Sequence, residues 1–369
     1  MKVTPRIEID LDKISYNASL LKKWYGKKGI EVTGVIKGVA GSVPVAKALY
    51  LSGINNLADS KIANIRKMKE AHIPATYILL RSPALSEVVD TVSYADISMN
   101  TELEIIRALD QEAKRQRKVH SIIIMVEMGD LREGILPKDL PAFLHAVLNL
   151  KGVRVVGIGT NFACYGGIIP TPKKMQEFSE LVKSMVDKFQ LELTFISGGN
   201  SANYQWMQSV EDVGCINNIR LGESILLGTD PVSQKPIPGL YHDAFRFVAE
   251  VIESKRKPSV PYGKRASNGF GEKVHFEDRG VIRRAILGVG RQDVLVSGLK
   301  PLSGVEILGS SSDHIILDAK NIDLKPGDEV AFIPNYGAML AAMTSPYVHK
   351  QYVHWKKRKN LLLQKTVTA

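Results

Sequence analysis

Between residues 29 and 222, apolar runs of strand length alternate with segments of helical periodicity. The apolar runs lie at residues 29–38, 54–60, 75–80, 95–100, 120–128, 154–162, 193–199 and 216–222. Several of these runs are continuously apolar, which is typical of parallel strands that helices cover on the outside. Eight such units predict a (β/α)8 barrel of the TIM type. An open doubly wound sheet is the alternative, because the number of strands does not prove closure.

The segments between the apolar runs carry the spacing of helices. The clearest example is residues 173–189, where one face of a predicted helix is apolar: Met175, Phe178, Leu181, Val182 and Met185. This stripe is interpreted as core, not as a cofactor-binding motif. No GxGxxG sequence follows the first apolar run, which argues against a dinucleotide-binding site.

The pattern changes after residue 235, where short strand-like runs are punctuated by Gly, Pro and Asp. We therefore predict a barrel domain over residues 1–235, a smaller all-β domain over residues 236–353, and a basic tail over residues 354–369. Residues 5–11 alternate between apolar and polar positions. Two placements are open for residues 1–11: the start of the barrel domain, or a strand of the β domain.

The net charge raises the alternative of nucleic-acid binding, which the rest of the sequence does not favour. The chain of 369 residues has a net charge of +11. A basic protein attracts nucleic acid, but part of the excess lies in the stretch HWKKRKN at residues 354–360, and elsewhere the charges are mixed. We therefore expect a solvated surface with a basic tail, and we rank nucleic-acid binding as unlikely.

The composition also bears on location and on metals. The chain has two cysteines, no CxxC or HExxH spacing, and no apolar run of about 18 residues. The first ten residues contain no apolar signal segment. These features predict a cytoplasmic protein with no membrane span and no metal site.

Candidate chemistry lies where the predicted strands end, because the active groups of such barrels gather at the carboxyl ends of their strands. The first apolar run ends in Lys37, and the small residues Gly38, Ala40 and Gly41 follow it. The last two runs end in SGGNSAN and RLGES, whose small residues expose backbone donors that suit a phosphate. A lysine opposite a phosphate site is the combination that pyridoxal phosphate requires.

A set of motifs then gives a family resemblance. IEIDLDKISYN, VIKGVAG, GDLREGI, GTNFACYGG, SGGNSAN, NIRLGES and ILGSSSDH occur in this order along the chain. Together they resemble the alanine racemase family of fold-type III pyridoxal-phosphate enzymes, and within it most closely the ornithine racemase branch. The resemblance extends from residue 5 to about residue 353, and it implies a homodimer with shared active sites.

The resemblance also implies roles for individual residues. Lys37 would bind the cofactor aldehyde and serve as one of two racemising bases, and Arg132 would approach the substrate carboxylate, with Glu127 as a possible neighbour. Cofactor contacts are assigned to these residues: Lys37, Asn200, Ser201, Arg220, Gly222, Glu223 and Tyr336. Asp313 would enter from the β domain across a dimer interface.

Arg220 carries most of the chemical argument for racemisation. It would face the pyridine nitrogen, and a guanidinium that stays protonated cannot give this nitrogen a proton. The cofactor would then be a weaker electron sink, which suppresses decarboxylation and transamination. A surface ion pair between Arg220 and a carboxylate such as Glu223 is the alternative.

Four positions depart from the alanine racemase pattern. Gly41 replaces a phosphate-binding tyrosine, Met125 a lysine that is often carbamylated, and Asn161 a histidine against the cofactor ring. Val289 replaces the tyrosine that acts as the second base, and valine cannot transfer a proton. Other groups must then act on the second face.

The candidates for this second base are Asp313 and His314, ranked slightly ahead of Cys164 and Tyr165. All four have ordinary structural alternatives, since a cysteine is often a small buried apolar residue and an aspartate often caps a turn.

The sequence therefore predicts a pyridoxal-phosphate-dependent racemase of ornithine or a similar basic amino acid. One alternative is a non-catalytic pyridoxal-phosphate-binding protein, which the predicted β domain argues against. The other is a different fold-type III enzyme, such as a decarboxylase or an aldolase. Arg220 argues against a decarboxylase, and the lack of a metal-binding His/Cys pair argues against a metal-assisted aldolase.

Overall fold

The computed structural model describes residues 3–353, which form two structural units. One unit contains the described residues up to Asp10 together with those from Asp243 onward. The other unit is the continuous segment Leu11–His242. The predicted basic tail at residues 354–369 lies outside the described residues.

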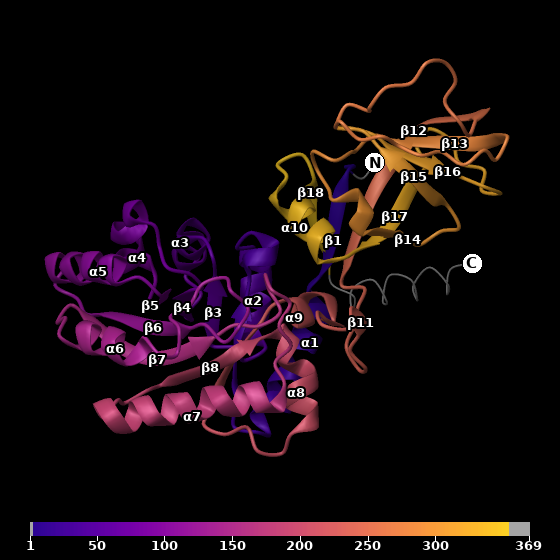
Figure 1. The fold of residues 1–369 in the computed structure, drawn as a ribbon. Coiled ribbons are helices and arrows are strands. Elements are labelled where there is room, and N and C mark those ends of the chain that lie inside the picture. The colour runs from indigo at the N-terminus through magenta and orange to yellow at the C-terminus, as the bar shows by residue number, and fades with distance from the viewer. Residues whose placement is uncertain (1–2, 354–369) are drawn as a thin grey trace, which may run out of the picture. The chain divides into compact units, whose positions relative to one another are not determined.

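The unit Leu11–His242 is a closed barrel of eight parallel strands, shown in purple to pink in Figure 1. Its strands are β2 (Glu31–Val35), β3 (Asn56–Asp59), β4 (Thr76–Leu79), β5 (Ile97–Asn100), β6 (His120–Val126), β7 (Val153–Thr160), β8 (Phe195–Asn200) and β9 (Asn218–Leu221). The barrel closes because β2 pairs in parallel with both β3 and β9. Each of the eight predicted apolar runs coincides with one of these strands, and only β7 and β8 extend one residue beyond their runs. The barrel prediction is therefore confirmed, and the open-sheet alternative is wrong.

Helices connect the strands and cover the barrel. They are α1 (Leu11–Gly26), α2 (Val43–Leu51), α3 (Ile62–Glu70), α4 (Val88–Tyr94), α5 (Leu103–Arg115), α6 (Leu140–Leu148), α7 (Pro172–Phe189), α8 (Tyr204–Ser209) and α9 (Glu223–Leu227). In α7, the Thr171 hydroxyl caps the N-terminus and Pro172 occupies the first turn, as the preferences for these positions predict. A short two-stranded ribbon, β10 (Thr229–Asp230) with β11 (Lys235–Pro236), follows α9.

An apolar cluster occupies part of the barrel interior, which agrees with the apolar runs in the sequence. Its core cluster takes one or two residues from seven strands: Val35, Ala58, Ile78, Ile97, Met99, Ile123, Met125, Val156 and Phe195. These side chains fill much of the space inside the barrel. Buried polar side chains lie within neighbouring strands as well, where Ser197 donates to Asn218 at 2.7 Å and Asn218 donates to Thr33 at 3.0 Å.

The other unit is a sheet in the order β14–β17–β12–β13–β16–β15, with β1 pairing with both β12 and β18. The strands are β1 (Arg6–Asp10), β12 (Phe245–Pro258), β13 (Val281–Leu287), β14 (Leu299–Pro301), β15 (Glu306–Ser310), β16 (Ile315–Asp318), β17 (Glu329–Pro334) and β18 (His349–Val353). All pairs are antiparallel except β1 with β18, which is parallel. The alternating segment at the N-terminus is thus a strand of this sheet.

One helix interrupts this otherwise all-β unit. Helix α10 (Tyr336–Thr344) follows β17 and is orange-yellow in Figure 1. The Asn335 side chain accepts a hydrogen bond from the backbone N–H of Ala338 at 3.0 Å, which caps the first turn. The predicted strand pattern did not include this helix, although Asn335 before the Ala- and Met-rich segment is a helix-start signal.

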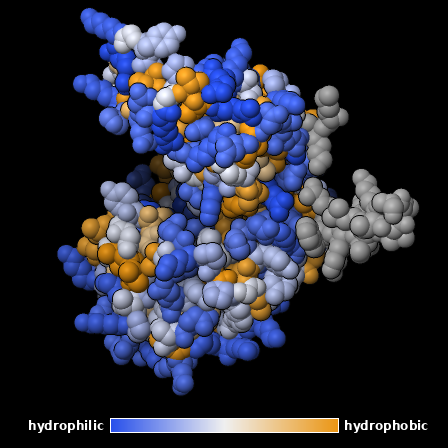
Figure 2. Space-filling model, turned by 90° about the vertical axis from the view of Figure 1, so that its right-hand side faces the viewer, coloured by the Kyte–Doolittle hydropathy of each residue, from blue (hydrophilic) through white to orange (hydrophobic). Residues whose placement is uncertain are grey.

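The surface shows no large segregated apolar face in the view of Figure 2, where hydrophobic residues lie among hydrophilic ones. Within residues 3–353, no helix combines the length and the apolar character needed to cross a membrane.

The buried side chain of Arg6 holds β1 in the sheet. Its two terminal nitrogens each donate to a different carboxylate oxygen of Glu329 at 2.6 Å, and its Nε donates to Glu8 at 3.0 Å. The hydrogen bonds that Arg6 donates to Glu329 are the main cause of its raised pKa. The N-terminal strand is therefore attached to β17 by side chains as well as to β12 and β18 by backbone.

We predict that Arg6→Ala destabilises the β unit by about 3 kcal/mol, because removing one partner leaves carboxylates without a counter-charge. Urea unfolding followed by a probe in this unit measures the change. Arg66→Ala is the matched control, since Arg66 forms an exposed pair with Glu70 and exposed pairs contribute little. Equal free energies of unfolding for the two variants would contradict the role of Arg6 in holding β1 in the sheet.

Candidate active site

The polar residues of the barrel converge where its strands end. Lys37 follows β2, Asp59 ends β3, Asn161 follows β7, Asn200 ends β8, and Arg220 lies in β9. Because parallel strands of a closed barrel end on the same rim, these residues share one mouth. The candidate site is built on this rim.

Lys37 presents a half-buried amine at the mouth. It begins the short 3-10 helix Lys37–Val39, after which Ala40 and Gly41 turn the chain with φ angles of 49° and 61°. Burial is the main cause of a lowered pKa of Lys37; the positive charges of Arg132 and Arg220 lower it further, while Cys164 and Asp59 act in the opposite direction. Within the described residues, no hydrogen bond or ion pair involves this amine. The amine of Lys37 therefore lies in a cationic environment, with a lowered pKa.

Arg220 is a buried cation that neutral groups hold. Only 5% of the residue is exposed. Its guanidinium donates to the Ser197 hydroxyl at 2.6 Å, to the Thr160 carbonyl at 2.8 Å and to Asn161 Oδ1 at 3.2 Å. Burial, assisted by the charge of Arg132, lowers the pKa of Arg220 to about 10, so it remains protonated at neutral pH.

The alternative pairing of Arg220 with Glu223 is not formed in the part of the chain that the structure describes. Glu223 instead accepts a hydrogen bond from the Thr229 hydroxyl at 3.2 Å, and burial raises its pKa. Within the described residues, Arg220 is thus held by neutral groups and not by a carboxylate.

A cluster of donors lies beside Arg220. The buried Ser201 hydroxyl oxygen lies 3.2 Å from the backbone nitrogens of both Gly222 and Ser224, and 3.1 Å from the Ser224 hydroxyl. Hydroxyls and backbone N–H groups that converge in this way suit a phosphate. A Cβ atom on Gly222 would approach Val35 Cβ to 3.2 Å, so a glycine keeps this approach open.

Asn200 holds the loops of this region together. Its amide nitrogen donates to Asn161 Oδ1 at 2.9 Å and to the Phe162 carbonyl at 2.7 Å, while its Oδ1 accepts from the Ala202 N–H at 2.7 Å. The neighbouring Asn161 has a buried Nδ2 without a hydrogen-bond partner. Asn200 therefore acts on the site through Asn161, which offers a free donor.

Arg132 is oriented by its own neighbour in sequence. Its Nε and Nη2 pair with the two carboxylate oxygens of Glu133. Met125, at the position of the carbamylated lysine, is 3% exposed and lies inside the barrel core. Glu133 thus supplies the anion that orients Arg132. Sequence reasoning missed this residue, although an acidic residue directly after Arg132 in GDLREG was a visible signal.

The loop after β7 brings Cys164 to the same place. Arg132 Nη1 lies 2.9 Å from the Cys164 sulfur. The buried Asp130 carboxylate accepts from the backbone N–H groups of Cys164, Tyr165 and Ile168 at 2.9–3.3 Å. Burial raises the pKa of Asp130, but these backbone donors outweigh it and lower the pKa overall. Asp130 therefore fixes the loop, and Tyr165 is left 78% exposed.

The close approach of Asn64, which Asp59 holds in place, explains why position 41 is a glycine and not the tyrosine of the family pattern. Asp59 Oδ1 accepts from the Lys61 N–H at 2.9 Å and from Asn64 Nδ2 at 3.0 Å. Its Oδ2 is buried without a partner, and burial raises its pKa. A Cβ atom on Gly41 would lie 2.6 Å from Asn64 Cβ, so this turn has no room for the tyrosine of alanine racemases.

The remaining predicted residues lie in the β unit. Asp313 and His314 occupy the turn between β15 and β16, where Asp313 Oδ1 lies 3.1 Å from the Ser312 hydroxyl and 2.9 Å from His314 Nδ1. These hydrogen bonds, chiefly that of Ser312, lower the pKa of Asp313. Val289 is buried, and a Cβ on the next residue, Gly290, would lie 2.4 Å from the Asp313 nitrogen. Tyr336 is the first residue of α10.

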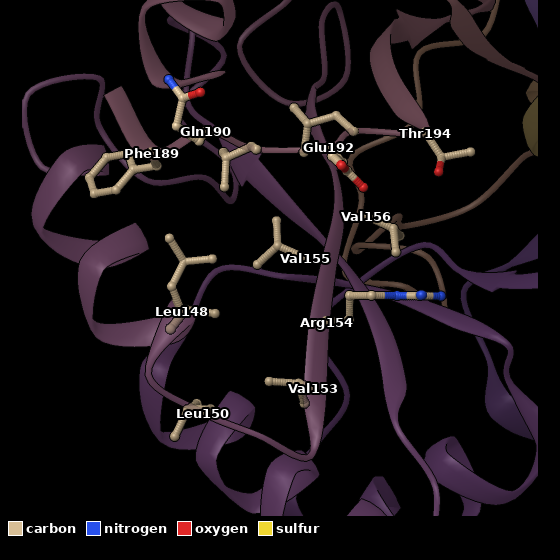
Figure 3. A pocket seen from close by; sticks show the side chains of 13 residues that line it. Leu148, Leu150, Val153, Arg154, Val155, Val156, Phe189, Gln190, Glu192 and Thr194 are labelled. Atoms are coloured by element: carbon tan, nitrogen blue, oxygen red, sulfur yellow. The ribbon is translucent and has the colours of Figure 1, made fainter. Parts of the chain in front are cut away.

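A pocket at the opposite end of the barrel is less suited to chemistry. It is lined by residues at the amino ends of β7 and β8, among them Val153, Val155 and Thr194 (Figure 3). Figure 3 shows aliphatic side chains together with Arg154, Gln190, Glu192 and Thr194, and this face of such barrels serves stability. Among residues 3–353, no group of three or more His, Cys, Asp or Glu side chains is placed to hold a metal.

Comparisons with known proteins agree with this geometry. Residues 9–231 match the family model described as alanine racemase, N-terminal domain. An ornithine racemase of Acetoanaerobium sticklandii is 39% identical over 94% of this chain and 99% of its own. A lysine racemase of Thermotoga maritima is 39% identical over 95% of this chain and 99% of its own. The chain therefore belongs to the alanine racemase family, and its class is that of the amino-acid racemases.

Solved structures share the fold. An alanine racemase of Clostridium difficile 630 superposes with a TM-score of 0.73 at 20% identity, over 96% of this chain and 97% of that one. A D-threonine aldolase from Filomicrobium marinum gives 0.71 at 16% identity, over 92% and 88% of the two chains. The architecture is thus common to enzymes of different names, and the side chains at the mouth must decide the chemistry.

We predict that Lys37 is acylated at lower pH than an exposed lysine such as Lys264. Acylation requires the neutral amine, and a lowered pKa means that this form appears at lower pH. Peptide mass spectrometry after labelling with acetic anhydride over a pH series measures this in the protein alone.

Removing one positive charge should raise the pH at which acylation of Lys37 begins. Arg132→Gln removes a charge that lowers the pKa of Lys37, whereas Arg132→Lys keeps it as a control. If acylation of Lys37 began at the same pH as acylation of Lys264, the cations would not act on this amine. The same would follow if Arg132→Gln left that pH unchanged.

Proposed function

We propose that this protein is a pyridoxal-phosphate-dependent racemase that interconverts the L- and D-isomers of ornithine or lysine. The observation that carries the proposal is the convergence of three cations at one barrel mouth: the amine of Lys37 and the guanidinium groups of Arg132 and Arg220. Such a site favours a doubly anionic cofactor together with a substrate carboxylate.

The residues at the mouth fit this cofactor. Lys37 has an amine without a hydrogen-bond partner among the described residues, and the donors around Ser201, Gly222 and Ser224 suit a phosphate. Asn161 has a buried Nδ2 with nothing to bind, so a ligand at the mouth would satisfy it. When bound, pyridoxal phosphate withdraws electrons from the amino-acid Cα and makes its proton acidic.

Lys37 is proposed to remove or return the Cα proton on one face. A neutral amine is required, and burial together with the neighbouring guanidinium groups lowers the pKa of Lys37 in that direction. Arg220 is proposed to face the pyridine nitrogen, because its charge is fixed by Ser197, Thr160 and Asn161 and no carboxylate competes for it. A protonated guanidinium gives no proton to that nitrogen, which restrains the side reactions of a stronger electron sink.

Arg132 is proposed to bind the substrate carboxylate. The paired Glu133 leaves Nη1 directed away from the salt bridge and fixes the plane of the guanidinium. The choice of a basic side chain rests on the two curated relatives, whose names give ornithine and lysine as their substrates.

The β unit is proposed to complete the site of a second copy in a cytoplasmic homodimer. In that arrangement Tyr336 would reach the phosphate, and Asp313 with His314 would enter beside the substrate. The family resemblance supports this proposal, and the lowered pKa of Asp313 makes it a hydrogen-bonding group rather than a strong base.

A chiral assay tests the proposed function. Purified protein with pyridoxal phosphate is incubated with L-ornithine, L-lysine or L-alanine, and the D-isomer is quantified. We expect D-ornithine or D-lysine to form, with a loss of at least about 100-fold in Lys37→Ala, because general bases contribute factors of this size. If the protein binds the cofactor through Lys37 and forms no D-isomer, a non-catalytic binding protein is the better assignment. Release of CO2 or an aldehyde would indicate a decarboxylase or an aldolase.

We further predict that Glu133→Gln lowers kcat/KM for racemisation by about 10- to 100-fold, because an arginine that is no longer held misplaces the substrate carboxylate. Met125→Leu is the matched control, since Met125 lies in the core and does not orient Arg132. Steady-state kinetics on both variants measure the effect. Equal kinetics in Glu133→Gln and the wild type would remove Glu133 from the site.

A further inference from the structure

The second face of the substrate needs a proton-transferring group, and the family position for it holds the buried Val289. This question rests on the proposed function, because only a racemase requires a group on each face of Cα. A side chain that can exchange protons must therefore be placed near Lys37 by another part of the chain.

Cys164 meets this requirement within the barrel unit. Its sulfur lies 2.9 Å from Arg132 Nη1, the group proposed to bind the substrate carboxylate. Lys37 follows β2 and Cys164 lies in the loop after β7, so both are at the same mouth of the barrel. The backbone of Cys164 is fixed by Asp130, so the thiol is held in position although it is exposed.

The buried carboxylate of Asp59 provides a second, independent feature of this site. Asp59 is fully buried, its Oδ2 has no partner, and its charge also acts on Lys37. An unsatisfied buried oxygen is costly unless the working site supplies a partner. A proton carried by Lys37 would supply that partner on one face of the substrate Cα. On the opposite face, Arg132 would stabilise a thiolate of Cys164.

We propose that the Cys164 thiol is the catalytic acid and base on the face of Cα opposite Lys37. In one direction the Lys37 amine takes the Cα proton and becomes an ammonium, while the thiol gives its proton to the other face and becomes a thiolate. In the reverse direction the thiolate takes the proton and the ammonium gives one. Between turnovers the ammonium loses its proton to water and the thiolate regains one, so no oxidant or reductant is needed.

The other candidates are less suited to this role. Asp313 accepts hydrogen bonds from Ser311, Ser312 and His314, and its lowered pKa makes it a weak base. Its hydrogen bond also occupies the Nδ1 of His314. Tyr165 is largely exposed, and its backbone rather than its ring is held by Asp130.

Exchange of the Cα hydrogen separates the two faces. Wild type, Cys164→Ala and Cys164→Ser, each loaded with pyridoxal phosphate, are incubated in D2O with the pure L- or pure D-isomer of the substrate. We expect both cysteine variants to lose at least about 100-fold in racemisation. They should still exchange the Cα hydrogen of one enantiomer, the one whose hydrogen faces Lys37, and lose exchange of the other.

Cys215→Ala is the matched control, because the hydrogen bonds of Cys215 that involve its thiol and its backbone N–H are with Ser179 on α7. Racemisation by Cys164→Ala at the wild-type rate would overturn the inference, and so would loss of exchange of both enantiomers. One-sided exchange in His314→Gln or Asp313→Asn would place the second group in the β unit and also overturn it. A wild type that forms no D-isomer would instead remove the proposed function.

Thiol alkylation gives a readout without cofactor or turnover. The thiolate is the reactive form, and Arg132 Nη1 lies 2.9 Å from the Cys164 sulfur. We expect iodoacetamide to modify Cys164 several-fold more slowly in Arg132→Gln than in the wild type, with Arg132→Lys close to the wild type and Cys215 as the internal reference. An unchanged rate in Arg132→Gln would overturn the contact on which the inference rests.

Discussion

The buried guanidinium of Arg220 is the group on which the arrangement of the site depends. A charge with 5% of its residue exposed is costly unless it is hydrogen-bonded, and Ser197, Thr160 and Asn161 supply those bonds from β8 and from the end of β7. None of these groups neutralises the charge. The mouth therefore stays cationic, which adds to the larger effect of burial in lowering the pKa of Lys37 and favours an anionic ligand.

The departures from the alanine racemase pattern form a consistent set around this cation. Asn161 replaces a ring and accepts from Arg220 and Asn200. Met125 belongs to the core, and Glu133 orients Arg132 in place of a modified lysine. Gly41 is required by the close approach of Asn64. Each change alters how a charged group is held while the cluster of charges is kept, which agrees with a branch that has a different substrate but the same class of reaction.

The fold could be predicted from sequence with few losses. The eight barrel strands are apolar because their side chains fill the barrel or lie under helices, so hydrophobicity alone located them. Helix α10 was not predicted, because the segments before and after it in the chain have the pattern of strands. A site with Lys37, Arg132 and Arg220 was predicted from the sequence, and the functional roles of these residues stay predictions. The roles of Glu133, Asp130 and Asp59 were not predicted, because they depend on which loops meet at the mouth.

The sequence by itself determined the barrel, the β unit, the family and the lysine at the end of the first barrel strand, because these follow from periodicity and from motifs that are local in the chain. Only the tertiary structure decided which groups act on that lysine. Cys164, Asp59 and Arg132 are separated from Lys37 by 22 to 127 residues, and closure of the barrel brings their charges together. Charge–charge interactions depend on distance in space, and the order of residues does not contain that distance.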